Sequence, residues 1–230
     1  TLFPYTTLFR SYYFGTAIRE LGEYMVECVK EYLNNIESEL GKNIEDMDME
    51  SIEKAARIIM ESEKQGGRIH VTGIGKPGHV AGYIASLLSS TGTSAYELHG
   101  TEAVHGSSGQ VKKGDVVIAI SNSGETMELE ATVQTLLANG AHIISCTGNP
   151  QSTLAKQSEV CLVAHVDEEG DELNKPPRAS ILSEILILQC LSVVLQEAKK
   201  LDLKQYVKWH PGGSLGEQTR KEEQLCPSKD

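Results

Sequence analysis

Hydrophobic and polar residues follow one another along the chain in a pattern that predicts two helices and then a repeat of strands and helices. Between Thr16 and Leu40 apolar residues recur at helical spacing, as at Met25 and Val29. A second helix is predicted from Asp48 to Lys64, and Gln65-Gly66-Gly67 marks its end. We expect both helices to pack on the domain that follows them.

Five short β-rich runs come next, and helical stretches separate them. A run that is apolar throughout, such as Val116–Ile120, is typical of a strand covered on both faces. Strands that alternate with helices predict a parallel sheet with right-handed crossovers. We therefore expect an α/β fold, a three-layer αβα sandwich around a five-stranded parallel sheet, preceded by the N-terminal helices. The predicted strands are Arg68–Thr72, Ser94–Leu98, Asp115–Ser121, His142–Thr147 and Val160–Val166.

The ends of the chain differ in character from its middle. Thr1–Ser11 matches the conceptual translation of a common sequencing adapter, so we expect it to be an artefact and the natural protein to begin upstream of, or near, Tyr12. We assign residues 12–66 to the N-terminal helices and 67–217 to one domain. Residues 218–230, rich in Lys and Glu, are expected to form a solvated polar tail.

Composition narrows the class of protein. The 230 residues are 40% hydrophobic and 23% charged, which is ordinary for a globular enzyme. A formal net charge of -11 argues against nucleic acid or an anionic membrane as the main partner, so a phosphate site would need local geometry. The scattered cysteines form no C-x-x-C pair and fit a reducing, cytoplasmic location. No apolar run is expected to span a bilayer, and Ile181–Leu195 is predicted to be a buried helix.

The loops after the strands are the candidate sites, because ligands bind at the carboxyl ends of parallel strands. The first loop, Gly73–Gly78, spells G-x-G-x-x-G, and Glu97 lies near the end of the next strand. That combination fits a dinucleotide site, although Lys76 is unexpected in it. A tight strand-to-helix turn would require the same glycines, so both interpretations stay open.

The loop after the third strand has the composition of a phosphate site. Free amides at a helix N-terminus, the helix dipole and clustered hydroxyls can hold a phosphate dianion without a basic residue. The alternative is a Ser-rich cap that serves only the helix. Glu125 and Glu128 fall in the first turn and could complement the dipole, or one of them could act as a base. The loop residues are Ser121, Asn122, Ser123, Gly124, Glu125 and Thr126.

Three further positions could carry chemistry. The spacing H-x-x-E-x-x-H from His99 to His105 lacks the H-E-x-x-H form, and we expect no metal there. His210 stands in an irregular Gly-Pro-rich segment, where it is either functional or simply exposed. Glu168-Glu169 follows the fifth strand at the same sheet edge. No G-x-S-x-G motif supports a serine hydrolase.

Together these segments resemble a sugar isomerase (SIS) domain, and most closely the arabinose-5-phosphate isomerase family, also called KpsF/GutQ. The resemblance covers roughly Glu20 to Gly216 and is densest at GIGKPGH, HGTEAVHG, VVIAISNSGETME and HPGGSLG. It implies the SIS fold and an aldose–ketose isomerase that acts on a phosphorylated sugar through an enediol, without a cofactor. A non-catalytic sugar-phosphate regulator and a nucleotide-binding oxidoreductase remain alternatives.

The resemblance also implies roles for individual residues. Lys76, next to Gly75, would contact substrate oxygens, and Ser121, Asn122, Ser123, Gly124 and Thr126 would bind phosphate. The family's two acids fall on Glu128 and Glu169, and its two histidines fall on His105 and His210. In that family these residues meet across the subunits of a homotetramer. The chain departs from the family at Pro77, usually serine, at Ser107, usually aspartate, and at Pro176–Ser180, usually rich in Thr and Ser.

Overall fold

Five parallel strands form the centre of the fold in a computed structural model, which describes residues 5–212 and 217, with side chains from residue 25 onward. The strand order is β2-β1-β3-β4-β5, and every neighbouring pair is parallel. The five predicted strands are confirmed, with ends that differ by up to three residues. The strands are β1 (Ile69–Gly73), β2 (Ala95–Glu97), β3 (Val116–Ile120), β4 (His142–Thr147) and β5 (Val160–Val163).

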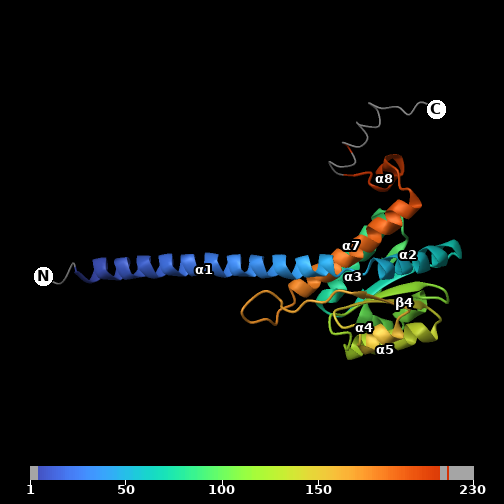
Figure 1. Cartoon of the computed structure of the whole chain (residues 1–230), viewed down its shortest axis with the longest axis horizontal. Coiled ribbons are helices and arrows are strands. Elements are labelled where there is room, and N and C mark those ends of the chain that lie inside the picture. Colours follow the sequence, from blue (N-terminus) through green and yellow to red (C-terminus); the bar gives the residue numbers. More distant parts are fainter. Residues whose placement is uncertain (1–4, 213–216, 218–230) are drawn as a thin grey trace.

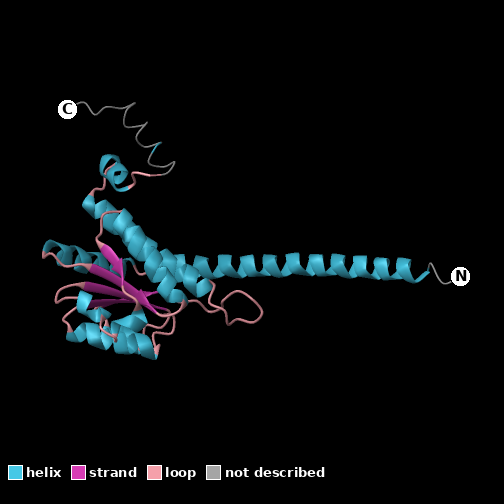
Figure 2. Cartoon of the chain, turned by 180° about the vertical axis from the view of Figure 1, so that it is seen from behind, coloured by secondary structure: helices cyan, strands magenta, loops and turns pink. Residues whose placement is uncertain are grey.

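Helices cover both faces of the sheet, so the three-layer αβα sandwich is confirmed (Figure 2). On one face α2 (Met49–Lys64), α3 (Lys76–Ser90) and α7 (Ala179–Lys199) bury aliphatic side chains against the strands. The other face is covered by α4 (Gly100–Ala103), α5 (Met127–Ala138) and α6 (Thr153–Gln157), with the 3-10 helix η1 (Ser107–Gln110) beside them. All five residues of β3 are buried, which explains the apolar run Val116–Ile120 that predicted a strand covered on both faces.

The chain order reverses between β1 and β3, and this reversal positions the site. β2 lies on one side of β1, whereas β3, β4 and β5 follow on the other. The last residues of the two central strands, Gly73 and Ile120, are register partners. The loops that leave β1 and β3 therefore start side by side at the carboxyl edge, where open α/β sheets bind their ligands.

Helix α7 is the core helix predicted over Ile181–Leu195. Ile187, Leu188, Leu191 and Leu195 are buried in the main core. By length and composition α7 could cross a membrane, and it is the one such helix among the described residues. The expectation that no apolar run is long enough to span a bilayer is therefore wrong by this criterion. Half of its most apolar window, 50%, is nevertheless buried inside the domain, and core helices commonly have this composition.

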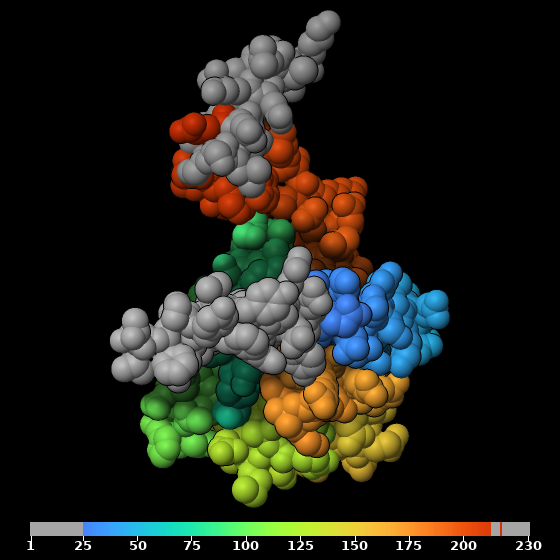
Figure 3. Space-filling model, turned by 90° about the vertical axis from the view of Figure 1, so that its left-hand side faces the viewer, coloured from blue at the N-terminus to red at the C-terminus, as the bar shows by residue number. Residues whose placement is uncertain are grey.

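Helix α1 (Tyr5–Glu45) is longer than the predicted Thr16–Leu40 and projects from the domain as a rod (Figure 1). The C-terminal part of α1 contacts the domain next to the segment that follows β5 (Figure 3). The Asn43 side chain donates to the carbonyl of His165 at 2.6 Å. Met25, Val29 and Leu33, which belong to the predicted apolar stripe, are more than half exposed, at 58%, 53% and 57%. In this chain α2 packs on the sheet, but most of α1 does not.

Helix α8 (Leu203–Trp209) lies beyond the C-terminal end of α7 (Figure 3). The end of α7 is fixed by Lys199, whose ammonium group donates to the Gly92 carbonyl at 2.9 Å and to Thr93 Oγ1 at 2.6 Å. Since these residues precede β2, α8 lies near the amino edge of the sheet. The expected polar tail, residues 218–230, and the end of the fourth motif, residues 213–216, fall outside the described residues.

Candidate active site

The turn between β1 and α3 accounts for the glycines of the first motif. A Cβ atom at Gly73 would lie 2.8 Å from the backbone carbon and oxygen of Pro77, so only glycine lets the helix start this close to the strand. Gly75 has φ +67°, a conformation that favours glycine, and no side chain caps α3 there. Lys76 is the first residue of α3 and is exposed at the carboxyl edge.

The loop between β3 and α5 has the geometry of an anion site. Ser121 is buried, and its hydroxyl lies 3.1 Å from the hydroxyl of Thr126 and accepts from Gly124 N at 3.2 Å. Thr126 is the N-cap of α5, but its side chain makes no capping hydrogen bond. The first amides of α5 therefore remain available to an anion that enters from the carboxyl edge. The loop that was predicted to bind phosphate therefore lies at the carboxyl edge of the sheet.

The segment after β4 holds this loop in shape. Gly148 N donates to the Asn122 carbonyl at 2.9 Å, and Leu154 N donates to the Gly124 carbonyl at 3.1 Å. Glu125 accepts from Thr153 N at 2.8 Å, and this hydrogen bond lowers the pKa of its carboxyl. Glu125 is thus hydrogen-bonded to the N-terminus of α6, whereas Glu128 is exposed in the first turn of α5.

Glu169 is held at the start of α7. Its Oε2 atom accepts from the backbone N–H of Arg178 at 2.6 Å and of Ser180 at 3.1 Å. Its own N–H donates to Asn174 Oδ1 at 2.6 Å. Two amide donors on one oxygen fix the orientation of a carboxylate at a helix N-terminus, where the dipole also favours negative charge. Of the two predicted acids, Glu169 is the one with a defined position.

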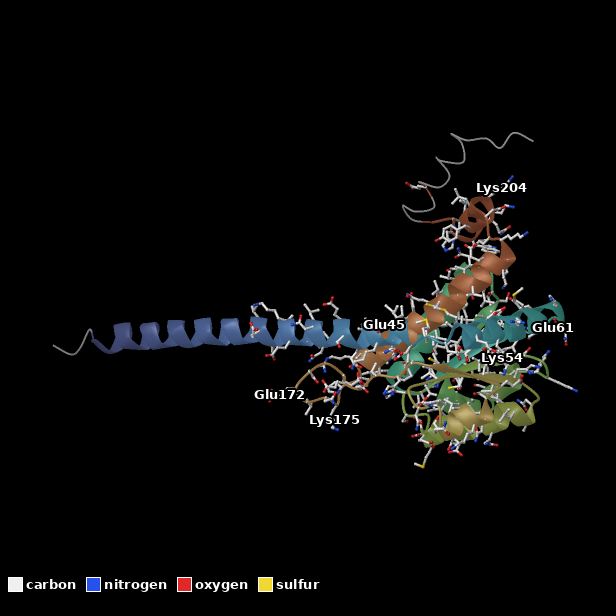
Figure 4. All side chains as sticks on the ribbon, viewed as in Figure 1. Glu45, Lys54, Glu61, Glu172, Lys175 and Lys204 are labelled. Atoms are coloured by element: carbon white, nitrogen blue, oxygen red, sulfur yellow. The ribbon has the colours of Figure 1, made fainter. Side chains whose placement is uncertain are left out.

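A cleft of about 940 Å³ lies beside Glu169, between α1 and the loop that leads to α7. Figure 4 labels Glu172 and Lys175 on this projecting loop, at the opposite end of α7 from Lys204. The cleft is lined by several carboxylates (Glu27, Glu31, Glu168, Asp171 and Glu172). Such a lining repels a phosphate, so the neutral hydroxyl loop is the better place for that group.

The histidines of the sequence motifs are not brought together. His105 is exposed between α4 and η1, and α4 spans only Gly100–Ala103, too short to align His99, Glu102 and His105 on one face. No group of three or more His, Cys, Asp or Glu side chains in the described part of the chain is arranged to hold a metal ion.

His210 lies at the other edge of the sheet. It caps α8, where its Nδ1 atom donates to the Tyr206 carbonyl at 2.8 Å and its ring stacks on Tyr206 at 3.9 Å. The adjacent Trp209 packs against Gly92, which precedes β2. Within one chain, His210 is therefore separated from Lys76, Ser121 and Glu169.

This chain is similar in sequence to proteins of one known family. Residues 63–192 match the family described as "SIS domain". The chain is 40% identical over 167 residues to the arabinose 5-phosphate isomerase KdsD of Francisella tularensis, covering 73% of this chain and 51% of that protein. It is also 40% identical to the protein of the same name from Pseudomonas aeruginosa, of which it covers 49%. The chain thus spans about half the length of the curated relatives it matches.

Two solved structures are similar to this chain over nearly their whole length. An Escherichia coli CFT073 protein, determined in complex with arabinose 5-phosphate, superposes with a TM-score of 0.76 at 32% identity, covering 82% of this chain and 98% of that one. A Bacteroides fragilis structure, described as a putative phosphosugar isomerase involved in capsule formation, gives 0.73 at 32% identity, with 81% and 97% covered.

Two features of the site were not identified from the sequence. One is the support that Gly148 and Thr153 give to the phosphate loop, for which the sequence offers no more than a Gly-Asn-Pro turn signal after β4. The other is Glu184, a buried acid whose pKa is raised by burial and by the charge of Glu169. Its signal was visible, because it is the single charged residue in the apolar run Ile181–Leu195.

Proposed function

Since this chain belongs to the SIS domain family, we propose that it is an aldose–ketose isomerase that acts on a phosphorylated sugar of the arabinose 5-phosphate class. One observation carries the proposal. The hydroxyl and amide loop at Ser121–Thr126 lies at the β1–β3 reversal next to Lys76, and a fixed carboxylate, Glu169, lies at the same edge. This combination supplies an anchor for phosphate, a cation for sugar oxygens and a candidate base.

The chemistry follows from these groups. The phosphate binds at the amides of α5 and at the hydroxyls of Ser121 and Thr126, where the helix dipole offsets the net negative charge of the protein. Lys76 binds the carbonyl oxygen of the open-chain sugar. A carboxylate, Glu169 or Glu128, removes the proton from C2, and the electron pair forms the C1=C2 bond of the enediol as the carbonyl oxygen takes up a proton. Returning a proton to C1 and releasing the proton of the C2 hydroxyl then gives the ketose.

The site is completed by a second subunit in this proposal. Lys76 and His210 lie at opposite edges of the sheet, so both can serve one substrate only if His210 comes from another copy of the chain. Met25, Val29 and Leu33 support such an assembly, because they form an exposed apolar row on the projecting part of α1. We propose a homotetramer, with histidines from neighbouring chains opening the sugar ring. A reducing cytoplasm fits the free cysteines of the described residues, Cys28, Cys146, Cys161 and Cys190.

An NMR assay of the purified protein tests the function. Arabinose 5-phosphate and a panel of pentose and hexose phosphates are incubated in D₂O, where enolisation exchanges the C1 or C2 proton for deuterium as the ketose forms. Glu128→Gln and Glu169→Gln should each lower turnover by about 100-fold or more if the side chain is the base. Glu130→Gln, an exposed acid on the same helix α5, is the matched control and should retain activity. Binding without conversion of any sugar phosphate would refute the proposal in favour of a regulator.

A further inference from the structure

Glu184 is a fully buried acid without a visible partner. Its relative exposure is 0%, and neither carboxylate oxygen has a hydrogen-bond partner among the described residues. An ionised carboxylate is almost never buried in this way, because removing its charge from water is strongly unfavourable. Burial, followed by the charge of Glu169, raises the pKa of Glu184 to about 8. At neutral pH the side chain is therefore a neutral carboxylic acid with one proton to donate.

The surroundings of Glu184 restrict the group that can accept this proton. The titratable groups that interact with it are Glu169, from the loop after β5, and Cys146 of β4, whose thiol pKa is raised by burial and by Glu184. Helices α1, α2 and α3 also pack against α7, but no charge from their described residues shifts the pKa of Glu184. A thiol is a weak acceptor, whereas a carboxylate is a strong one.

A second orphaned group lies at the same place. Ser180 is one turn before Glu184 on α7, on the same helix face, and its buried hydroxyl has no partner among the described residues either. The backbone N–H of Ser180 donates to Glu169 Oε2 at 3.1 Å. The other oxygen of Glu169, Oε1, has no hydrogen bond in the described part of the chain. Ser180 thus links two groups at the start of α7. One is the anionic acceptor Glu169, which its N–H contacts, and the other is the neutral acid Glu184, one turn later, whose proton is unused.

We propose that Glu184 is a positioning residue for Glu169: as a buried neutral acid it donates a hydrogen bond to the Glu169 carboxylate, so that the pair carries one negative charge and Glu169 keeps one orientation. The proposal deepens the isomerase function and rests on Glu169 acting in that reaction. It also predicts an alkaline limit to activity. When Glu184 loses its proton, the donor disappears and a second charge arises beside the first.

The pH profiles of kcat and KM test this role in the intact protein. In the wild type, kcat should fall above about pH 8 as Glu184 ionises. Glu184→Gln keeps a donor and cannot ionise, so kcat near neutral pH should stay within about threefold and the alkaline fall should disappear. Glu184→Leu removes the donor and should lower kcat by about 10- to 100-fold with KM nearly unchanged, because the reacting group loses its orientation. Ser192→Ala, a buried polar site farther along α7, is the matched control and should behave as wild type.

Two outcomes would overturn the proposal: an alkaline fall that persists in Glu184→Gln, or a Glu184→Leu protein with wild-type kcat. A spectroscopic measurement separates this failure from failure of the isomerase function. Infrared difference titration should show the C=O band of one protonated carboxyl that is absent in Glu184→Gln. Its midpoint should move to lower pH in Glu169→Gln, because that substitution removes the neighbouring charge. If no sugar phosphate is converted, a moved midpoint still supports the acid pair, and an unmoved one refutes it.

Discussion

Replacing Glu184 with glutamine should remove a large part of the pH dependence of folding stability. Glutamate has an ordinary pKa of 4.5, and burial raises the pKa of Glu184 to about 8 in the folded protein. Between these values the unfolded chain has released the proton and the native protein still holds it, so the free energy of unfolding falls as pH rises. The stability that the proton provides is complete below pH 4.5 and is lost once the pH passes about 8.

The magnitude follows from this gap of about 3.5 pH units. Each unit corresponds to about 1.4 kcal/mol, so the wild type should lose about 5 kcal/mol across the whole interval as an upper bound. Between about pH 6 and about pH 8 the free energy of unfolding of the wild type should fall by about 2 to 3 kcal/mol more than that of Glu184→Gln. This difference is measured by urea unfolding, followed by circular dichroism. One protein concentration is used throughout, because assembly also adds stability. Parallel pH curves for the two proteins would refute the reasoning, since they would mean that Glu184 is already ionised in the native state.

Three further predictions concern other parts of the molecule. Gly124→Ala should destabilise the protein by about 1 to 3 kcal/mol, because Gly124 has φ +67° and a Cβ would overlap the Ser152 side chain. The same substitution should abolish stabilisation by sugar phosphates in a thermal-shift assay. In the control Gly109→Ala the added Cβ meets open space, so neither effect is expected. Lys199→Ala should lower the free energy of unfolding by about 1.5 to 3 kcal/mol in urea titrations, because three hydrogen bonds to the loop before β2 and to Glu63 are lost; an unchanged midpoint would contradict this anchoring role. Lys76→Ala and His210→Asn proteins, each inactive alone, should recover isomerase activity when unfolded and refolded together, and no recovery would argue against a site shared between subunits.

The architecture was predictable from local pattern to a large extent. The run Val116–Ile120 indicated a doubly covered strand because each of its positions is apolar, and all five are buried. Asp48 predicted the start of α2 and accepts from the backbone N–H groups of Glu50 and Ser51. The position of the loop at Ser121–Thr126, between a strand and a helix, was also predictable, since it depends on consecutive residues.

Features that depend on contacts distant in sequence were not predictable. The orientation of Glu169 depends on amides nine and eleven residues later, at Arg178 and Ser180. From its position in the sequence, Glu125 could either complement the helix dipole or act in catalysis. Its hydrogen bond from Thr153 N, which the sequence does not reveal, favours a structural role. The place of His210 at the opposite edge follows from the path of α7 across the domain, which no motif encodes.

The anchoring of the phosphate loop has a thermodynamic consequence. Its carbonyls at Asn122 and Gly124 accept hydrogen bonds from the segment after β4, and these bonds hold the loop in shape without a ligand. A phosphate that binds to a pre-formed loop does not have to order a flexible backbone, so the entropic cost of binding is small. A few contacts can then suffice to hold a phosphate, even in a protein whose net charge of -11 repels anions.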